Sequence, residues 1–243
     1  MDRRIASVTP GGLLKAIADL AMPRPCVICG TELLHSEDNI CTECLADLPE
    51  TRFWTQSRNP MADRFNALID APSYCYAAAL IFYGAESPYR MVTQSLKYSR
   101  NLRSGRYFAA MLAERLSESE QFRDVDAVVP VPLHWTRRWK RGYNQAEIIA
   151  QVLAEKLDAE CVADALKRCR RTKSQTTLSI AEKEKNVRGA FVAGEKAPVS
   201  AKHILLVDDV FTTGSTLAAC YRALRQVVGS EARISIATLA FVN

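Results

Sequence analysis

ILLVDDVFTTGSTLAAC, residues 204–220, joins four apolar strand formers to two acids, a polar turn and the start of a helix with apolar periodicity. The apolar residues predict a buried strand that ends at Val207. Asp208 and Asp209 would then leave its carboxyl end. Because ligands of parallel α/β sheets bind beyond the carboxyl ends of the strands, this stretch predicts both the fold class and the place of a binding site.

The turn after the two acids has the composition of a phosphate-binding loop. Its residues are Thr212, Thr213, Gly214, Ser215 and Thr216. Backbone N–H groups at a helix start and the helix dipole favour an anionic phosphate, and hydroxyl groups add donors. The acids suit another group, because carboxylates accept hydrogen bonds from sugar hydroxyls or organise a hydrated Mg²⁺. A ribose 5-phosphate offers both partners, whereas the plain alternative is a strand, turn and helix with Asp and Thr as caps.

The rest of the chain alternates between strand and helix patterns. Apolar runs predict strands over 74–84, 126–133 and 233–242, and a 3.6-residue period predicts helices over 88–98, 102–118 and 144–157. This alternation predicts an α/β fold in which helices cover both faces of a parallel sheet. We expect residues 73–243 to form this domain. Residues 1–72 would hold a helix over 11–21, a cysteine-rich segment and a connector without clear period.

Composition excludes some classes of protein. With 243 residues, 48% of them hydrophobic, the chain is long enough to bury a core. Its net charge of +5 permits anionic ligands or nucleic acid without singling them out. No apolar run reaches the roughly 20 residues of a membrane span, and Lys15 and Asp19 interrupt the segment where a signal peptide would be apolar. We therefore expect a cytoplasmic protein.

Two Cys-x-x-Cys pairs near the N-terminus have the spacing of a metal site. They are Cys26 with Cys29 and Cys41 with Cys44. Four thiolates can bind one tetrahedral Zn²⁺ at about 2.3 Å, and such a closed shell is structural because it leaves no open position for catalysis. Four free cysteines are the alternative. The single cysteines are interpreted as small buried hydrophobes: Cys75, Cys161, Cys169 and Cys220.

A second strand end carries positive charge and aromatic rings. The segment WTRRWKRGY, residues 135–143, supplies Arg137, Arg138, Lys140 and Arg141, with Trp135, Trp139 and Tyr143 between them. Fixed cations in this position suit pyrophosphate. The same residues are also compatible with an ordinary solvated face. Interleaved aromatic and basic side chains can alternatively stack on the bases of single-stranded DNA, unless the tryptophans pack under the loop.

The segment RCRRTKSQTTLSIAEKEKNVRGAF, residues 168–191, is polar, basic and almost free of apolar periodicity before Leu178. This composition is typical of a mobile flap that closes over a ligand and excludes water. A surface hairpin explains the composition equally well.

With these segments together, the chain resembles the ComF family of phosphoribosyltransferase-like proteins. The resemblance rests on the N-terminal Cys-x-x-Cys pairs, VPVPLH…RGYNQA, R-x-R-x-T-x-x-Q with NVRGAF downstream, and VDDVFTTGSTLAAC, and it covers nearly the whole chain. It implies a type I phosphoribosyltransferase fold with a small zinc-ribbon-like segment. It also implies phosphoribosyl diphosphate (PRPP) as ligand, with Mg²⁺, and an association with DNA uptake in natural transformation.

The resemblance assigns roles to individual residues. PRPP would be bound by Asp208, Asp209, Thr212, Thr213, Gly214, Ser215 and Thr216, and the two acids would also be catalytic. Pyrophosphate would be bound by Pro130, Val131, Pro132, Arg137 and Arg141. A flexible loop would contain Arg168, Arg170, Thr172 and Gln175. Relatives usually carry further cysteine pairs before the catalytic domain, and residues 52–72 have none, so we expect one zinc ion.

Two functions remain open from the sequence. One is an enzyme that transfers the phosphoribosyl group to a nitrogen nucleophile. Purine-base relatives place an Asp where this chain has Thr212, and a Thr is no general base near neutral pH, so the acceptor is undetermined. The other is a non-catalytic module that binds PRPP or a nucleotide as a signal while it docks single-stranded DNA or a DNA-uptake protein.

Overall fold

The computed structural model describes residues 24–98, 101–169 and 189–242. The chain divides into two compact units, Met1–Asp47 and Leu48–Asn243. The helix expected over 11–21 lies outside the described residues, as do Arg170, Thr172 and Gln175 of the expected flexible loop. None of the helices in the described part of the chain combines the length and apolar character that crossing a membrane requires.

The described part of the first unit is a pair of tight turns followed by one short helix, α2 (Thr42–Ala46). Gly30 adopts φ +79° in the first turn, a conformation that favours glycine. The carboxylate of Glu37 accepts hydrogen bonds from the backbone N–H groups of Leu34 and Thr42, at 2.8 and 2.7 Å. This carboxylate therefore ties the turn to the start of α2.

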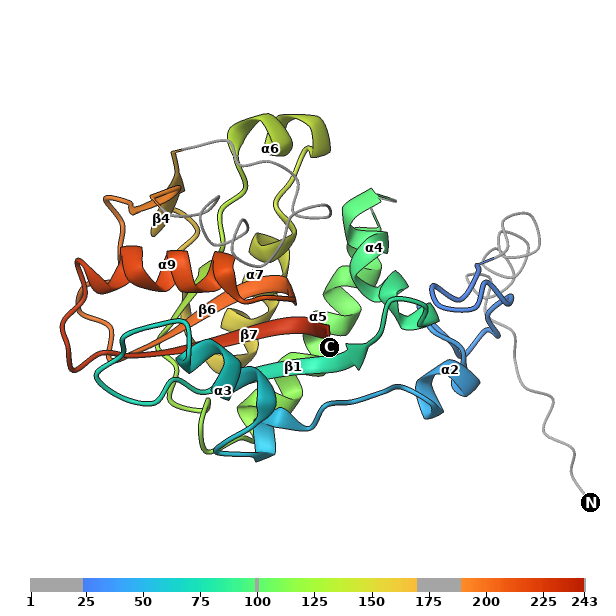
Figure 1. Cartoon of the computed structure of the whole chain (residues 1–243). Coiled ribbons are helices and arrows are strands. Elements are labelled where there is room, and N and C mark those ends of the chain that lie inside the picture. Colours follow the sequence, from blue (N-terminus) through green and yellow to red (C-terminus); the bar gives the residue numbers. More distant parts are fainter. Residues whose placement is uncertain (1–23, 99–100, 170–188, 243) are drawn as a thin grey trace, which may run out of the picture. The chain divides into compact units, whose positions relative to one another are not determined.

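The second unit is built on a five-stranded sheet in the order β1-β7-β6-β2-β3. Figure 1 shows three of these strands, β1, β7 and β6, next to one another. All neighbouring strands are parallel. The strands are β1 (Ala77–Tyr83), β2 (Ala127–Pro130), β3 (Glu160–Cys161), β6 (His203–Phe211) and β7 (Arg233–Val242). The predicted parallel sheet is confirmed, and the three strongest apolar runs of the sequence form β1, β6 and β7.

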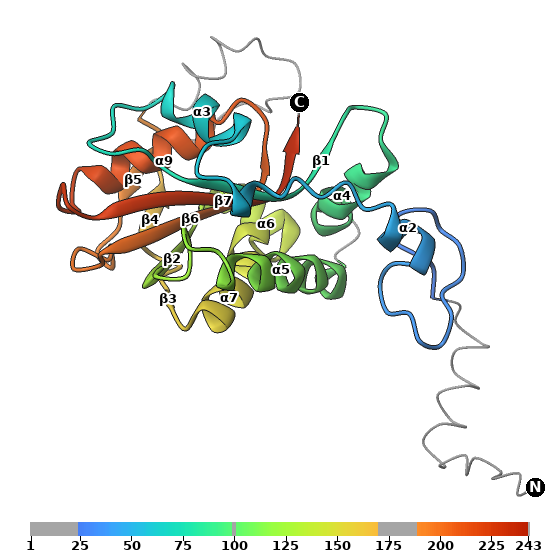
Figure 2. The same ribbon diagram turned by 90° about the horizontal axis from the view of Figure 1, so that it is seen from below.

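Helices cover both faces of the sheet, as predicted. Figure 2 shows α5 (Leu102–Ser117) and α7 (Gln145–Leu157) on one face, and α3 (Pro60–Asn66) and α9 (Ser215–Arg225) on the other. Among the described residues of this unit, the other helical elements are η1 (Phe53–Thr55), η2 (Pro88–Arg90), α4 (Met91–Tyr98) and α6 (Trp135–Arg141). Because both faces are covered, residues Ile204 to Val207 at the centre of β6 are fully buried.

A separate two-stranded antiparallel sheet pairs β4 (Leu166–Arg168) with β5 (Phe191–Ala193). Arg168 is the register partner of Phe191, and its guanidinium lies 5.0 Å from the centre of the Phe191 ring. The two ends of the segment 168–191 are therefore held side by side, which both the flap and the hairpin interpretation require.

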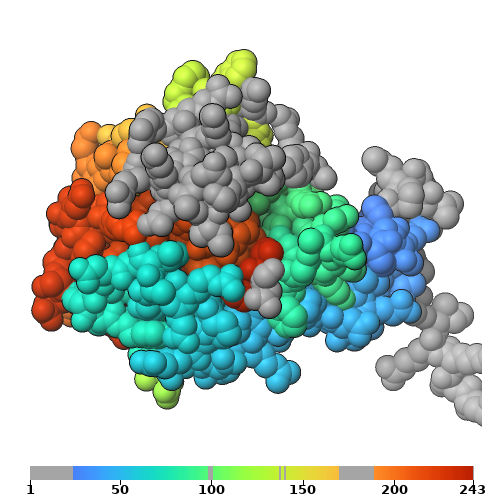
Figure 3. Space-filling model, in the orientation of Figure 1, coloured from blue at the N-terminus to red at the C-terminus, as the bar shows by residue number. Residues whose placement is uncertain are grey.

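Residues 52–72, predicted as a connector, pack into the second unit, which begins at Leu48. Phe53, Met61 and Phe65 are buried there, and the Phe65 ring meets the Tyr221 ring edge-on at 5.9 Å. In the space-filling view the cyan segment that contains α3 lies against the orange-red surface of α9 (Figure 3). The compact unit thus begins at Leu48, whereas the sequence places the boundary at 72/73. The short elements η1 and α3 leave too little periodicity for a sequence pattern to show.

The single cysteines are not all buried. Cys75 and Cys220 are buried as predicted, Cys161 is half-buried, and Cys169 is exposed. The prediction of burial is wrong for Cys169, which directly follows β4 at the edge of the small antiparallel sheet.

Candidate functional site

The candidate site lies where the connections of the sheet diverge. The chain passes from β2 to β3 in one direction across the sheet and from β6 to β7 in the other. Neighbouring strands whose connections diverge in this way form a crevice at their carboxyl ends, where α/β proteins bind ligands. This topology therefore predicts a ligand site between β2 and β6.

The two acids lie inside β6, not beyond it. The prediction that this strand ends at Val207 is wrong. Pairing with β2 stops at Pro130 and Val207, but pairing with β7 continues to Phe211. The long partner β7 supplies hydrogen bonds that offset the low strand propensity of aspartate. Asp208 and Asp209 consequently lie on the part of β6 that extends beyond β2, where β6 is paired with β7 alone.

The acids are close together and shielded from water. Asp209 is 7% exposed and Asp208 is partly buried. The backbone N–H of Asp209 donates a hydrogen bond to Oδ1 of Asp208 at 2.8 Å. Burial, together with the negative charge of Asp209, raises the pKa of Asp208 to about 8. Burial and the neighbouring charge therefore favour the protonated form of the Asp208 carboxyl group.

A lysine that the sequence analysis did not select completes this pair. Nζ of Lys97, near the end of α4, lies 2.7 Å from Oδ2 of Asp209. Burial is the largest single influence on the pKa of Lys97 and lowers it, but the charge and hydrogen bond of Asp209, with the charges of Asp208 and Tyr83, together outweigh burial and the net shift is upward. No local pattern distinguishes Lys97 from a solvated lysine, because its partner is distant in the sequence.

Three contacts fix the helix that carries Lys97. The hydroxyl of Tyr143 donates a hydrogen bond to the carbonyl of Leu96. The hydroxyls of Tyr83 and Thr93 lie 2.9 Å apart and share a hydrogen bond. A Cβ on Gly105 of α5 would overlap the Leu96 side chain, so the glycine permits close packing of α4 on α5. Tyr143 thus braces α4.

The predicted phosphate loop has the backbone of an anion site. Gly214 adopts φ +77° and is the N-cap of α9, where it supplies no side chain to bond the first N–H groups of the helix. A Cβ at Gly214 would lie 2.6 Å from the Phe211 ring, so a larger residue does not fit. The hydroxyls of Thr213 and Ser215 lie 3.0 Å apart and share a hydrogen bond. Of the predicted loop residues, Thr212 is exposed, Thr213 and Thr216 are half-buried, and Ser215 is buried.

Residues outside the predicted motif also support this loop. Nη1 of Arg64, from α3, donates a hydrogen bond to the carbonyl of Thr212 at 3.3 Å. The side chain of Leu68 would lie 2.9 Å from a Cβ at Gly214. The segment that the sequence assigned to a connector thus supports the loop from one side.

The predicted pyrophosphate segment begins beside β6. The N–H of Val131 donates to the carbonyl of Val207 at 2.8 Å, and the side chain of Asn144 donates to the carbonyl of Val131 at 3.0 Å. Pro130 and Val131 are buried, and Pro132 is half-buried. The backbone of these residues is therefore held next to the acids, at the carboxyl end of β2.

The basic residues lie on a helix, where the sequence predicted a loop. His134 caps the start of α6, and Gly142, with φ +84°, ends it. No proline or glycine interrupts the residues between them. Arg137 lies within α6, and Arg141 is its last residue and half-buried. Arg138 lies 3.4 Å from Glu147 of α7.

Both tryptophans of α6 are exposed. Trp135 is 71% exposed and Trp139 is 84% exposed. They are four residues apart and so share one face of the helix. The alternative that they pack beneath the segment is therefore excluded.

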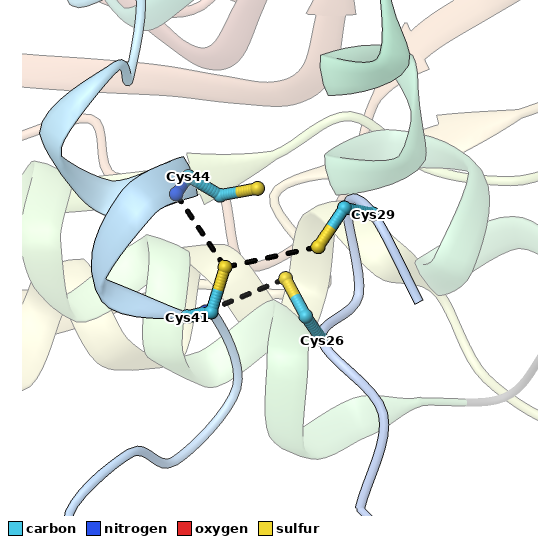
Figure 4. Close-up of side chains that lie close together, drawn as sticks. All are labelled: Cys26, Cys29, Cys41 and Cys44. Atoms are coloured by element: carbon cyan, nitrogen blue, oxygen red, sulfur yellow. Dashed lines mark hydrogen bonds between the residues drawn. The ribbon is translucent and has the colours of Figure 1, made fainter. Parts of the chain in front are cut away.

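The four paired cysteines converge (Figure 4). Their sulfur atoms all lie within 4.8 Å of one another, and the sulfurs of Cys29 and Cys41 are 3.7 Å apart. Two sulfurs bound to one tetrahedral Zn²⁺ at about 2.3 Å would be about 3.8 Å apart, so the cluster fits this ion. Hydrogen bonds from Thr31 lower the pKa of Cys29 to about 6, and burial raises the pKa of Cys44 above its ordinary value. Cys26 and Cys29 come from the first turn, and Cys41 and Cys44 from the start of α2.

Comparison with known proteins identifies relatives over most of the chain. The profile of the family described as "Phosphoribosyl transferase domain" matches residues 102–243. The chain is 27% identical to "Competence protein F" of Haemophilus influenzae, across 86% of this chain and 94% of that protein. It is also 27% identical to "DNA utilization protein YhgH" of Salmonella typhimurium, across 82% of this chain and 89% of that protein. Among solved structures, adenine phosphoribosyl transferase from Trypanosoma brucei aligns with a TM-score of 0.37 and 10% identity, across 76% of this chain and 81% of that chain.

Proposed function

Because the chain belongs to the ComF family and carries a phosphoribosyl transferase domain, we propose that it binds PRPP at the carboxyl ends of β2 and β6. The matched family accounts for the α/β architecture of residues 102–243. The observation that carries the proposal is the extension of β6 past β2, which leaves two acids beside the N-terminus of α9.

Each end of PRPP meets suitable chemistry in this arrangement. The N-terminus of α9, with Gly214 as its cap, favours the 5-phosphate. Asp208 and Asp209 accept hydrogen bonds from the ribose hydroxyls. The backbone of Pro130 to Pro132, held against β6, lies on the side assigned to pyrophosphate. Arg137 and Arg141 follow on α6 and add positive charge.

The enzyme reaction would be transfer of the phosphoribosyl group. Mg²⁺ that binds together with PRPP would contribute positive charge that stabilises the pyrophosphate leaving group. Arg141 of α6 and the backbone N–H groups at the start of α9 would hold the two charged ends of the ligand, so that ribose C1 faces a nitrogen nucleophile. Thr212 is exposed and cannot accept the proton of that nucleophile near neutral pH. A nucleophile that is already unprotonated fits this site best.

Titration calorimetry with PRPP and Mg²⁺ tests the binding proposal. We expect the double variant Asp208→Asn with Asp209→Asn to lose at least about tenfold in affinity, because each amide has one accepting oxygen where a carboxylate has two, and it carries no negative charge. Asp164→Asn changes an exposed acid just before β4; this variant is the matched control and should bind as the wild type does. Equal affinity for the double variant and the wild type would reject the site.

Pyrophosphate release decides between transfer and binding alone. The protein, PRPP and Mg²⁺ are incubated with a panel of bases, amines and single-stranded DNA. Release that depends on one acceptor supports the transferase. Tight binding of PRPP without release from any member of the panel supports a module that uses PRPP as a signal.

A second function, contact with single-stranded DNA, is favoured by the exposed face of α6. Trp135 and Trp139 offer two aromatic surfaces next to basic residues, and two relatives are named for competence and DNA utilization. Stacking contributes roughly 1–3 kcal/mol per base. The double variant Trp135→Ala with Trp139→Ala should therefore weaken the binding of labelled single-stranded DNA in fluorescence anisotropy. A wild-type affinity that does not fall with added salt would contradict phosphate contacts.

A further inference from the structure

The acid pair already has a cation. Oδ2 of Asp209 lies 2.7 Å from Nζ of Lys97, and the two side chains are only 10% and 25% exposed. Within the described residues, this oxygen is buried and accepts no hydrogen bond besides that ion pair. The ammonium group thus occupies the position from which a metal ion would bind this oxygen.

A divalent ion and the lysine cannot easily share this oxygen. Mg²⁺ binds oxygen ligands at about 2.1 Å and prefers near-ideal octahedral geometry. An ion at that distance from Oδ2 of Asp209 would lie within about 5 Å of the ammonium nitrogen of Lys97. Two positive centres repel strongly at this separation when the site is largely shielded from water. Asp208 gives only partial compensation, because one of its two carboxyl oxygens, Oδ1, already accepts the backbone N–H of Asp209.

We propose that Lys97 is the resident counter-ion of Asp208 and Asp209, so that these acids bind ribose hydroxyls and do not hold a free divalent ion. Lys97 is a positioning residue in this scheme: its charge orients the Asp209 carboxylate, and it does not touch the reacting atoms. The part that concerns ribose rests on the proposed function. The part that concerns the free metal ion does not.

The surroundings of Lys97 support a fixed role for it. Leu96, its neighbour, is bonded through its carbonyl to Tyr143 and packs against Gly105 of α5. Thr93 on the same helix contacts Tyr83 of β1. The helix is therefore held from the sheet, from α5 and from the segment after α6. A flexible surface lysine has no such supports.

Mn²⁺, a probe with an electron paramagnetic resonance signal, tests the counter-ion role without PRPP. The zinc-loaded wild-type protein should show no Mn²⁺ site at these acids. Lys97→Met keeps the length of the side chain but removes its charge, and should gain Mn²⁺ affinity at least about tenfold. The double variant Lys97→Met with Asp209→Asn should lose that gain. Lys196→Met, which removes an exposed charge elsewhere, is the control and should resemble the wild type.

Two outcomes of this experiment would overturn the counter-ion role. One is a tight Mn²⁺ site in the wild-type protein that Asp209→Asn removes. The other is the same Mn²⁺ affinity in Lys97→Met and the wild type. If Lys97→Met does not fold, Lys97→Arg keeps the charge and should exclude Mn²⁺ as the wild type does, and Mn²⁺ binding by that folded variant would contradict the proposal.

Calorimetry with PRPP and Mg²⁺ tests the positioning role. Lys97→Met should bind PRPP at least about tenfold more weakly, Lys97→Arg should recover part of the affinity, and Lys196→Met should match the wild type. Equal affinity in Lys97→Met and the wild type would reject the positioning role. If the wild type itself binds no PRPP, the proposed function fails, while the Mn²⁺ result still decides whether Lys97 is the counter-ion.

Discussion

The hydroxyl of Tyr143 donates a hydrogen bond to the carbonyl of Leu96, 47 residues earlier in the chain. This bond links the segment that follows α6 to the helix that carries Lys97. The phenol group of Tyr143 therefore connects the basic helix α6 with α4, whose Lys97 contacts the acid pair.

Tyr143→Phe removes this link and keeps the ring. We expect the free energy of unfolding to fall by about 1 kcal/mol, as is typical for one lost hydrogen bond. We also expect weaker PRPP binding, because α4 would no longer hold Lys97 firmly against Asp209. Denaturant unfolding and calorimetry measure the two effects. Unchanged PRPP affinity together with reduced stability would show that Tyr143 supports the fold alone.

Gly214→Ala should disable the proposed phosphate loop. The backbone of Gly214 is in the left-handed region, and an added Cβ would meet the Phe211 ring at 2.6 Å. Strain of this kind costs on the order of 1–3 kcal/mol. We expect lower stability and loss of measurable PRPP affinity. Gly229→Ala is the matched control, because a Cβ there meets nothing within 4 Å, and this variant should behave as the wild type does.

Metal analysis should return about one zinc ion per chain, bound by the four clustered cysteines. Cys44→Ser should lose the metal, while Cys161→Ser, at a position outside the cluster, should retain it. The sheet contains none of the four cysteines, so far-ultraviolet circular dichroism of Cys44→Ser should keep most of its amplitude. Full zinc content in Cys44→Ser would contradict the four-cysteine assignment.

His203 should make the protein less stable in acid. It is 1% exposed, and its ring nitrogens lie 2.8 Å from Asp124 Oδ1 and 2.8 Å from Ser235 Oγ. Burial lowers its pKa from 6.5 to about 4. The unfolded chain then binds a proton at higher pH than the folded chain does, so stability falls as the pH drops from about 6.5 towards 4.

The expected loss from His203 is about 2 kcal/mol between pH 7 and pH 5. Urea unfolding at the two pH values measures it, and nuclear magnetic resonance titration of the histidine rings measures the pKa directly. The exposed His35 gives a comparison signal in the same spectrum. A His203 ring that titrates near 6.5 in the folded protein would remove the basis of this prediction.

The sequence predicted the elements that are long and regular. Continuous apolar runs identified β1, β6 and β7, because strands buried on both faces contain few polar residues. The composition after β6 predicted a turn at the start of a helix, which the structure contains with Gly214 as the N-cap of α9, since Gly214 and its hydroxyl neighbours form a local pattern. The Cys-x-x-Cys spacing that predicted the cysteine cluster is also a local pattern. In each case the deciding residues lie within a few positions of one another.

What the sequence could not predict depends on distant partners. Lys97 has no local signature, and only the folded chain places it beside Asp209. The acids belong to β6 because β7 extends far enough to pair with them. The residues 48–72 form elements too short to show a period, yet Arg64 among them bonds the carbonyl of Thr212. These features arise from tertiary pairing, which local propensity does not contain.

The uneven burial of the three tryptophans gives the protein two separate optical signals. Trp54 is 6% exposed and reports on the interior, whereas Trp135 and Trp139 stand in solvent on α6. Iodide should quench the second pair and leave the first almost unaffected. Emission spectra recorded with and without iodide would therefore report separately on unfolding of the core and on the binding of a ligand to α6, without any attached dye.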